Sequence, residues 1–244
     1  MSGFEALKFF ATAPHPCSYL DGQEATTLFV EPNTPLSAEQ VVKLAESGFR
    51  RSGRYIYRPH CSQCSACISV RVPIASFQPK RRQIRTRKQN QDVTFNARSP
   101  ILDEDHYELY RRYIEVRHAD GDMYPPSPAQ YESFLASNHA HAFFLEARIG
   151  QQLIAVTLFD EIPGNGLSAI YTFFDPDPAF DSRSLGRLMI LQLIEIARGL
   201  ELTYLYLGYW IRDSQKMAYK TEYRPIEMLI GCWANSYHQR LLSQ

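Results

Sequence analysis

The sequence has no run of about 18 apolar residues, so it is not expected to cross a membrane. Its first residues, MSGFEALKFFATAPHP, lack a basic start followed by an apolar stretch, so no secretory signal is expected. The chain has only five cysteines, an odd number that makes a poor disulfide framework and favours a reducing cytoplasm. It also lacks internal repeats and low-complexity tracts, which argues against a repeat architecture.

Acidic residues are nearly missing from one segment. Residues 48–98 contain twelve Lys and Arg against a single acid, Asp92, so this segment carries a net charge near +11. The whole chain has 26 basic and 26 acidic residues, which leaves the remainder near −11. Such segregation creates a field over one part of the surface that concentrates a polyanion. The pattern indicates a protein that binds nucleic acid with one part and carries out its activity with the other.

Two groups of basic residues are the candidates for contacts with nucleic acid. They are Arg51 and Arg54, interleaved with tyrosines, and the run Lys80, Arg81, Arg82, Arg85, Arg87 and Lys88. Such a run is often no more than the solvated face of a strand or helix. If about six of these residues contacted phosphates, the logarithmic salt slope of binding would be roughly −4 to −5.

Three cysteines form a C-x2-C-x2-C run at Cys61, Cys64 and Cys67. This spacing suits a zinc ion or an iron–sulfur cluster, although small buried residues on a loop are the plainer alternative. A fourth ligand is needed, and Cys17 and His60 are the candidates.

The first half of the chain mixes loops, a helix and strands. Residues up to about 29 are rich in loop-forming Pro and Gly. Ser37 and Gln40 form a capping box ahead of an apolar helical face, and Gly48 ends this predicted helix. Residues 55–77 are typical of strands, interrupted by the cysteine run.

The sequence of the second half first predicts two helices, one capped by Asp103 and one starting at Ser127-Pro128. Three strands follow, over 142–147, 153–159 and 167–174. The last predicted elements are a helix over 182–198, a strand over 203–209, a short helix over 214–221 and a strand over 226–233. Hairpin-linked strands followed by a helix-crossed pair indicate a mixed sheet with helices on its faces. The element order resembles that of the Gcn5-related N-acetyltransferases. The predicted fold class is α+β, with an N-terminal, basic, cysteine-bearing domain over residues 1–95 and an acetyltransferase-like domain over residues 100–244.

A CoA-binding loop is only partly present. CoA-dependent acetyltransferases have a Q/R-x-x-G-x-G/A loop before the long helix, whose amides bind the pyrophosphate. Arg183 and Gly186 fit this pattern, but Leu188 is too bulky for its last position. CoA is therefore not expected as a partner.

The densest polar and aromatic cluster is the stretch 207–220. Lys216 and Lys220 are four residues apart, which places them on one face of a helix next to Tyr219. An amphipathic helix with solvated lysines is the alternative interpretation. Tyr171 and Asp175 end the third strand of the second half, which in this architecture opens onto the same cleft.

Several stretches together carry a more specific signal: PCSYL (16–20), EATT (24–27), GFRRSGRYIYRPHC (48–61), YLYLGYWI (204–211) and KMAYK (216–220). They resemble the aminoacyl-tRNA–protein transferases of the arginyltransferase family, in particular its short bacterial branch, the aspartate/glutamate leucyltransferases. The resemblance covers nearly the whole chain. It implies transfer of leucine from its tRNA to the α-amine of a protein that begins with Asp or Glu, which marks that protein for N-degron proteolysis.

The resemblance also leaves questions open. The donor rests on it alone, and arginine from Arg-tRNA is the alternative. Longer members have Cys-x-x-Cys where this chain has Cys17 and Leu20, which puts a metal in doubt more than the activity. No cofactor is expected to be required, because the aminoacyl ester is already activated.

The resemblance suggests roles for residues in and near these stretches. Proton handling is assigned to Tyr171, Asp175, Tyr209 and Tyr219, and recognition of the acidic side chain to Arg58, Lys216 or Lys220. The rival functions are a CoA-dependent N-acetyltransferase and a non-enzymatic, zinc-containing RNA-binding protein.

Overall fold

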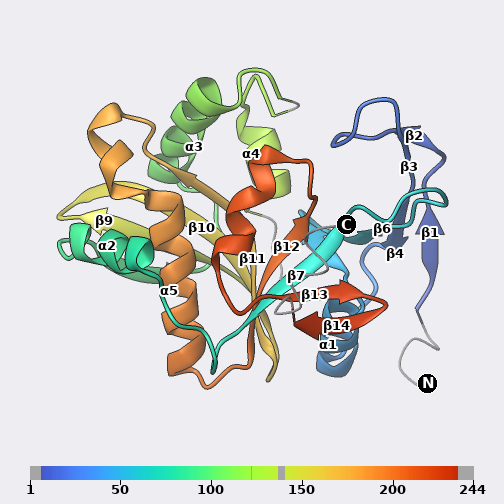
Figure 1. Ribbon diagram of the computed structural model, residues 1–244. Helices are drawn as coiled ribbons and strands as arrows, with labels where there is room; N and C mark the ends of the chain where they lie inside the picture. Colours follow the sequence, from blue (N-terminus) through green and yellow to red (C-terminus); the bar gives the residue numbers. More distant parts are fainter. Residues whose placement is uncertain (1–6, 122, 137–140, 236–244) are drawn as a thin grey trace.

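The computed structural model describes residues 7–121, 123–136 and 141–235, and its main feature is an eight-stranded mixed sheet (Figure 1). The sheet has the order β14-β13-β7-β12-β11-β10-β9-β8. Its strands are β7 (Ile68–Pro73), β8 (Thr94–Arg98), β9 (Ala142–Ile149), β10 (Gln152–Ile162), β11 (Gly166–Phe174), β12 (Tyr204–Trp210), β13 (Glu227–Ile230) and β14 (Cys232–Asn235). β11 and β12 pair in parallel and the other neighbours pair antiparallel, which confirms the predicted mixed sheet.

The N-terminal segment contains more strands than its sequence predicts. A four-stranded sheet has the order β1 (Phe9–Ala11), β4 (Thr27–Val30), β6 (Tyr55–Pro59) and β5 (Arg50–Ser52), and β2 (His15–Pro16) pairs with β3 (Glu24–Ala25). Much of this start is loop, as predicted, but its short strands were missed because strands this short show no periodicity, and β1 finds its partner some twenty residues away. Helix α1 (Ala38–Glu46) carries both hydrogen bonds of the predicted capping box.

Segments from both halves of the chain build the large sheet. β7, cyan in Figure 1, lies between β12 and β13, which are drawn in red. Helix α2 (Arg81–Gln89) contacts α5 (Leu185–Gly199), and β8 pairs with β9. The sheet therefore continues without a break across the predicted boundary between residues 95 and 100.

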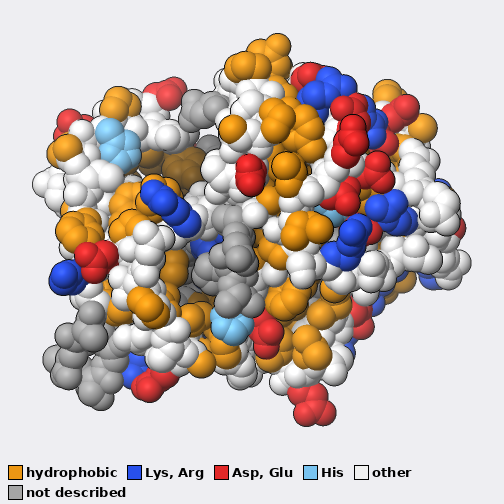
Figure 2. Space-filling model, turned by 180° about the vertical axis from the view of Figure 1, so that it is seen from behind, with side chains coloured by type: hydrophobic (Ala, Val, Ile, Leu, Met, Phe, Trp, Pro, Cys, Tyr) orange, Lys and Arg blue, Asp and Glu red, His pale blue; other side chains and the backbone are white. Residues whose placement is uncertain are grey.

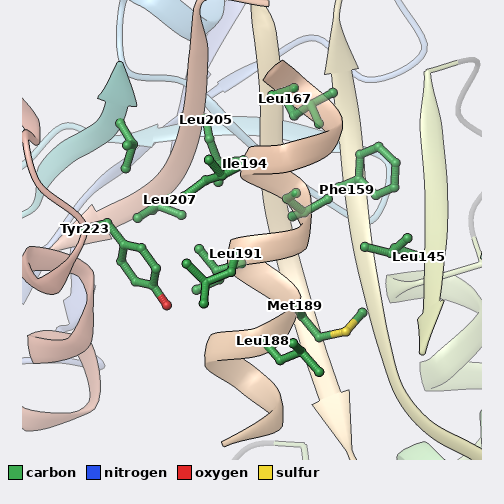
Figure 3. Close-up of a cluster of buried hydrophobic side chains, with 14 of the residues drawn as sticks. Leu145, Phe159, Leu167, Leu188, Met189, Leu191, Ile194, Leu205, Leu207 and Tyr223 are labelled. Carbon is green, nitrogen blue, oxygen red and sulfur yellow. The ribbon is translucent and has the colours of Figure 1, made fainter. Parts of the chain in front are cut away.

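Helices cover both faces of the sheet. On one face α5 places Leu191 and Ile194 close to Leu207 and Leu205 of β12, in a buried cluster that also contains Leu188 (Figure 3). On the other face lie α3 (Glu104–Arg117) and α4 (Pro128–Phe134), which begin at the predicted caps, Asp103 and Ser127. Burying apolar side chains on both faces fixes β10 and β11 as central strands.

Three predicted elements differ in detail. The last strand is a hairpin of β13 and β14, which turns at Gly231 with a φ of 72°. The predicted helix over 182–198 is split by Ser184, whose φ of 54° separates the 3₁₀ helix η1 (Pro178–Arg183) from α5. The predicted short helix over 214–221 is a second 3₁₀ helix, η2 (Gln215–Glu222).

Charged side chains of both signs are interspersed on the face seen in Figure 2, above all at its upper right. On α3, for example, Arg111 forms ion pairs with Glu108 and Glu115. Among the helices of the described segments, none combines the length and the apolar character needed to span a membrane.

Candidate active site

A cleft opens where β11 and β12 separate. The two strands are paired only from Gly166 to Ser168 on β11 and from Tyr204 to Tyr206 on β12. Beyond this point β12 shifts its register against β7, and Gly208 has a φ of 80° that favours glycine. The resulting cleft has a volume of about 730 Å³ and is bordered by β11, β12, the start of α5 and η2.

Many of the residues predicted from sequence meet in this cleft. Those that line it are Tyr171, Asp175, Tyr209, Tyr219, Lys216, Lys220, Arg51 and Arg82. Those outside its lining are Arg54, Arg58, Lys80, Arg81, Arg85, Arg87 and Lys88.

Tyr171 lines this site and has a buried hydroxyl. Its oxygen has no hydrogen-bond partner among the described residues, and its ring lies 5.3 Å from the ring of Phe134. Burial raises the pKa of Tyr171 far above its usual value of 10.0. The phenol therefore keeps its proton.

Two of the other predicted proton carriers are occupied by other contacts. The Tyr209 hydroxyl donates to the carbonyl of Gly48 at 2.7 Å, which uses its only proton. Asp175 accepts hydrogen bonds from Arg112 at 2.8 and 3.1 Å, and a third from the amide of Asp177. The contacts favour anchoring roles for both, and the proton-handling prediction loses support.

The two lysines of η2 differ in environment. Lys216 is exposed at the rim, whereas Lys220 is buried and donates to the carbonyl of Tyr209. Desolvation, aided by the charge of Arg50, lowers the pKa of Lys220 from 10.5 to about 8. A buried ammonium of this kind is held at a cost in folding free energy.

Replacing Lys220 with methionine is expected to stabilise the protein at pH 7. An unfolded lysine keeps its proton up to about pH 10.4, while folded Lys220 releases it near pH 8, so the folded state is penalised in full below pH 8. The shift corresponds to about 3 kcal/mol, and losing the hydrogen bond to Tyr209 offsets about 1 kcal/mol.

Thermal unfolding measured from pH 6 to pH 10 tests this expectation. The stability of the wild type rises between pH 8 and pH 10 relative to that of Lys220→Met. Equal pH dependence in the two proteins would show that the Lys220 ammonium carries no folding penalty.

Arg51 and Arg58 are not placed as the sequence predicts. Arg51 is buried and binds Asp160 with two hydrogen bonds of 2.7 and 2.6 Å, so it serves the fold rather than a phosphate. Arg58 donates to the carbonyl of Ser47 and lies over the ring of Phe49, outside the cleft lining. Its predicted contact with the acceptor's acidic side chain therefore loses support.

Helix α2 presents a basic face beside the cleft. Its buried residues, Gln83 and Thr86, turn one side toward the protein. The cations exposed on it are Lys80, Arg81, Arg85 and Lys88, and none of the four is ion-paired with a described residue. The two remaining arginines of α2 contact acids: Arg82 lies 3.6 Å from Glu222 at the cleft, and Arg87 binds Glu195.

The four cysteines predicted as metal ligands lie in one neighbourhood. All are half-buried and free, and burial together with the charges of Cys17, Cys61 and Cys64 raises the pKa of Cys67 to about 11. Among the described residues, however, no three His, Cys, Asp or Glu side chains are arranged to hold a metal ion. The donor types suit zinc, but the arrangement does not fit it as it stands.

His118 is a cleft residue that sequence reasoning missed. It is the C-cap residue of α3, and its Nε2 atom lies 3.3 Å from the hydroxyl of Tyr113. Burial and the charge of Lys216 lower its pKa below 6.5, so its imidazole is neutral at pH 7. The only signal in the sequence is that His118 follows the predicted helix that begins at Asp103. No neighbouring residue shows that this helix ends at the cleft.

The partial CoA loop has a structural explanation. Arg183 forms hydrogen bonds of 2.7 and 2.8 Å with Asp92, which occupies the guanidinium. Leu188 points into the core and leaves the loop unobstructed, so the steric argument from sequence was wrong.

Comparison with known proteins finds matching family models and similar sequences. Residues 15–85 match the family model "Arginine-tRNA-protein transferase, N terminus", and residues 105–230 match "Arginine-tRNA-protein transferase, C terminus". A protein of Pseudomonas putida (strain ATCC 700007 / DSM 6899 / JCM 31910 / BCRC 17059 / LMG 24140 / F1) named "Aspartate/glutamate leucyltransferase" is 52% identical over 231 residues, which are 95% of this chain and 97% of the relative. One of the same name from Pseudomonas paraeruginosa (strain DSM 24068 / PA7) is 50% identical with the same coverage.

Among solved structures, one titled "Crystal structure of FemX" is similar with a TM-score of 0.47 and 10% sequence identity, covering 86% of this chain and 81% of that chain.

Proposed function

Because this chain belongs to the arginine-tRNA-protein transferase family, we propose that it transfers leucine from leucyl-tRNA to the α-amine of proteins that begin with Asp or Glu. The observation that carries the proposal is the identity of about one half, over nearly the whole of both chains, with relatives named aspartate/glutamate leucyltransferase. The product enters N-degron proteolysis, and both substrates meet in the cytoplasm.

The reaction requires positioning and proton transfer. The acceptor amine attacks the ester carbonyl carbon, a C–N bond forms, and the C–O bond to the ribose breaks. The amine gives up a proton and the ribose oxygen takes one. Because the ester is already activated, no covalent enzyme intermediate and no cofactor are required. Positioning supplies about 7–11 kcal/mol of barrier reduction in such reactions.

Two cleft residues suit the proton transfers. Tyr171 has a protonated hydroxyl without a partner among the described residues, so it is our candidate donor to the developing oxyanion or to the ribose oxygen. His118 has a neutral imidazole in the same cleft, so it is our candidate acceptor for the amine proton. Asp175 and Tyr209 hold the surrounding elements in place.

The cleft favours leucine over arginine as the donor. The guanidinium of an arginyl group would require an unpaired carboxylate in the cleft. Among the described residues, the acids that line the cleft are Asp175, Asp181 and Glu222. Each of them is ion-paired, with Arg112, Arg117 and Arg187 respectively. The lining also contains apolar side chains: Ala169, Ile170, Phe174, Leu185, Ile190 and Met217. An apolar donor side chain therefore fits better than a cationic one.

The basic face of α2 is our candidate for binding the tRNA. Its exposed cations lie beside the cleft, to which Arg82 connects them. Phosphate contacts of this kind supply affinity and orientation without reading sequence.

One assay tests the function. The protein is mixed with radiolabelled Leu-tRNA or Arg-tRNA and with peptides that begin with Asp, Glu or Ala. We expect label from Leu-tRNA on the Asp and Glu peptides alone. Label from Arg-tRNA instead would correct the donor, and acetylation of the peptides by labelled acetyl-CoA would replace the proposal by its rival.

A further inference from the structure

Two positive charges are buried at the cleft without a countercharge among the residues that the structure describes. Arg50 and Lys220 both line the cleft, and they are only 6% and 8% exposed. Neither forms an ion pair with a carboxylate of the described residues. Their charges act unfavourably on each other. Buried charges in proteins are normally paired, so this arrangement is unusual.

The surroundings of Arg50 are neutral. Its guanidinium donates to the hydroxyl of Ser69 at 2.6 Å and to the carbonyl of Phe49 at 3.2 Å, and it lies 4.8 Å from the centre of the Tyr206 ring. Its Nε atom is buried and has no hydrogen-bond partner within the described segments. The charge is thus held in place but not neutralised, and one donor is left unsatisfied.

The other arginines of the cleft differ in this respect. Arg82 and Arg187 both contact Glu222, and Arg117 binds Asp181 at 3.0 Å. Within the described part of the lining, only Arg50 and Lys220 are both buried and without a compensating negative charge. This pair therefore provides the strongest attraction for a small anion.

We infer that Arg50 and Lys220 together bind the side-chain carboxylate of the acceptor's first residue and so select Asp and Glu. The inference rests on the proposed function and assigns its specificity. A single carboxylate that reaches the pair compensates charge that the fold leaves unpaired. An Asn or Gln side chain of the same shape leaves both cations uncompensated, so it is rejected.

A carboxylate fits this position better than a phosphate of the tRNA. The exposed cations of α2 meet a polymer backbone at the surface, where phosphates remain solvated. Arg50 and Lys220 lie beneath the surface: Arg50 is close to Tyr57 and Tyr209, and Lys220 donates to the carbonyl of Tyr209. A terminal side chain enters such a site more readily than a backbone phosphate does.

Gly208 lies beside this pair. Its φ of 80° favours glycine, and a Cβ atom built there would be in ordinary van der Waals contact with the Nζ atom of Lys220, at 3.6 Å.

The test compares peptides that begin with Asp and with Asn, in steady-state transfer from leucyl-tRNA. For Arg50→Met and Lys220→Met we expect the KM for the Asp peptide to rise roughly 30-fold or more, since truncating one partner of a buried charge contact has effects of this size. The preference for Asp over Asn should fall by a similar factor, and the KM for leucyl-tRNA should stay within about twofold. Arg50→Lys, which keeps the charge, should retain part of the preference.

Arg224→Met is the matched control. Arg224 is exposed, lies four residues from Lys220 and does not line the cleft, so this variant loses one positive charge outside the site. We expect its KM values and its preference to equal those of the wild type. Thermal unfolding of each variant identifies any that fails to fold. If Arg50→Met does not fold, the two single variants Arg50→Lys and Lys220→Met test whether the pair selects Asp over Asn.

Two results would overturn the inference. One is an unchanged ratio of Asp to Asn transfer in folded variants. The other is a rise in the KM for leucyl-tRNA with equal loss for all peptides, which would assign the pair to an RNA phosphate. Failure of the wild type to transfer leucine to any peptide would instead contradict the proposed function, and calorimetric binding of the Asp peptide to wild type and variants would still test the pair.

Discussion

Replacing Lys80, Arg81, Arg85 and Lys88 with serine together is expected to weaken the binding of leucyl-tRNA roughly 10²–10³-fold at about 150 mM salt. The four cations are exposed on one side of α2, while Gln83 and Thr86 hold the opposite side against the protein. If each contacts one phosphate, the variant also lowers the magnitude of the logarithmic salt slope by about 3. Filter binding between 50 and 300 mM salt measures both quantities.

The matched control is Arg111→Ser on α3. Arg111 already contacts Glu108 and Glu115, so its charge is compensated and its loss changes RNA affinity little. An unaltered affinity and slope in the fourfold α2 variant would show that the tRNA is bound elsewhere.

Removing the hydroxyl of Tyr171 has the second large effect. In Tyr171→Phe we expect kcat to fall roughly 10²–10³-fold, as when one donor to a developing oxyanion is removed. KM values for both substrates should change little, because the ring and its contact with Phe134 remain. Folding stability should not fall, because the lost hydroxyl is buried without a partner.

Tyr131→Phe provides a matched control for this variant. Tyr131 also has a buried hydroxyl without a partner in the described part of the chain, but its ring packs in the core with Tyr110 and Phe173, away from the cleft lining. Its kcat should equal that of the wild type. An equal kcat in Tyr171→Phe, measured by single-turnover transfer, would remove Tyr171 from the mechanism.

Local features of the fold could be predicted from the sequence. The capping box of Ser37 and Gln40 and the N-caps Asp103 and Ser127 depend on residues within one helical turn, and all are found. The cleft residues from β11 and η2 were also found, because their aromatic and basic residues are dense in the sequence.

What the sequence could not show depends on contacts between distant residues. Arg51 is a basic residue in a basic segment, yet Asp160, 109 residues away, buries it in an ion pair. The Tyr209 hydroxyl is used by the carbonyl of Gly48, 161 residues away. Local composition contains no trace of either partner, so charge density overstated the number of residues that face a ligand.

Arg50 shows the same effect in reverse. In sequence it is one of several arginines and was not assigned a role of its own. Only the fold shows that it is buried beside Lys220 without a carboxylate partner in the described residues. Because it is buried there, Arg50 becomes a candidate for selecting an acidic side chain of the acceptor.

The most direct test of the account compares intact leucyl-tRNA with leucyl-adenosine obtained by ribonuclease digestion, each with the same labelled leucyl ester and an Asp-headed peptide. If one chain holds the RNA on α2 while the ester and the amine meet in the adjoining cleft, transfer from the intact donor exceeds transfer from the fragment by at least 10²-fold at equal low concentration. Equal rates from the two donors would contradict this account.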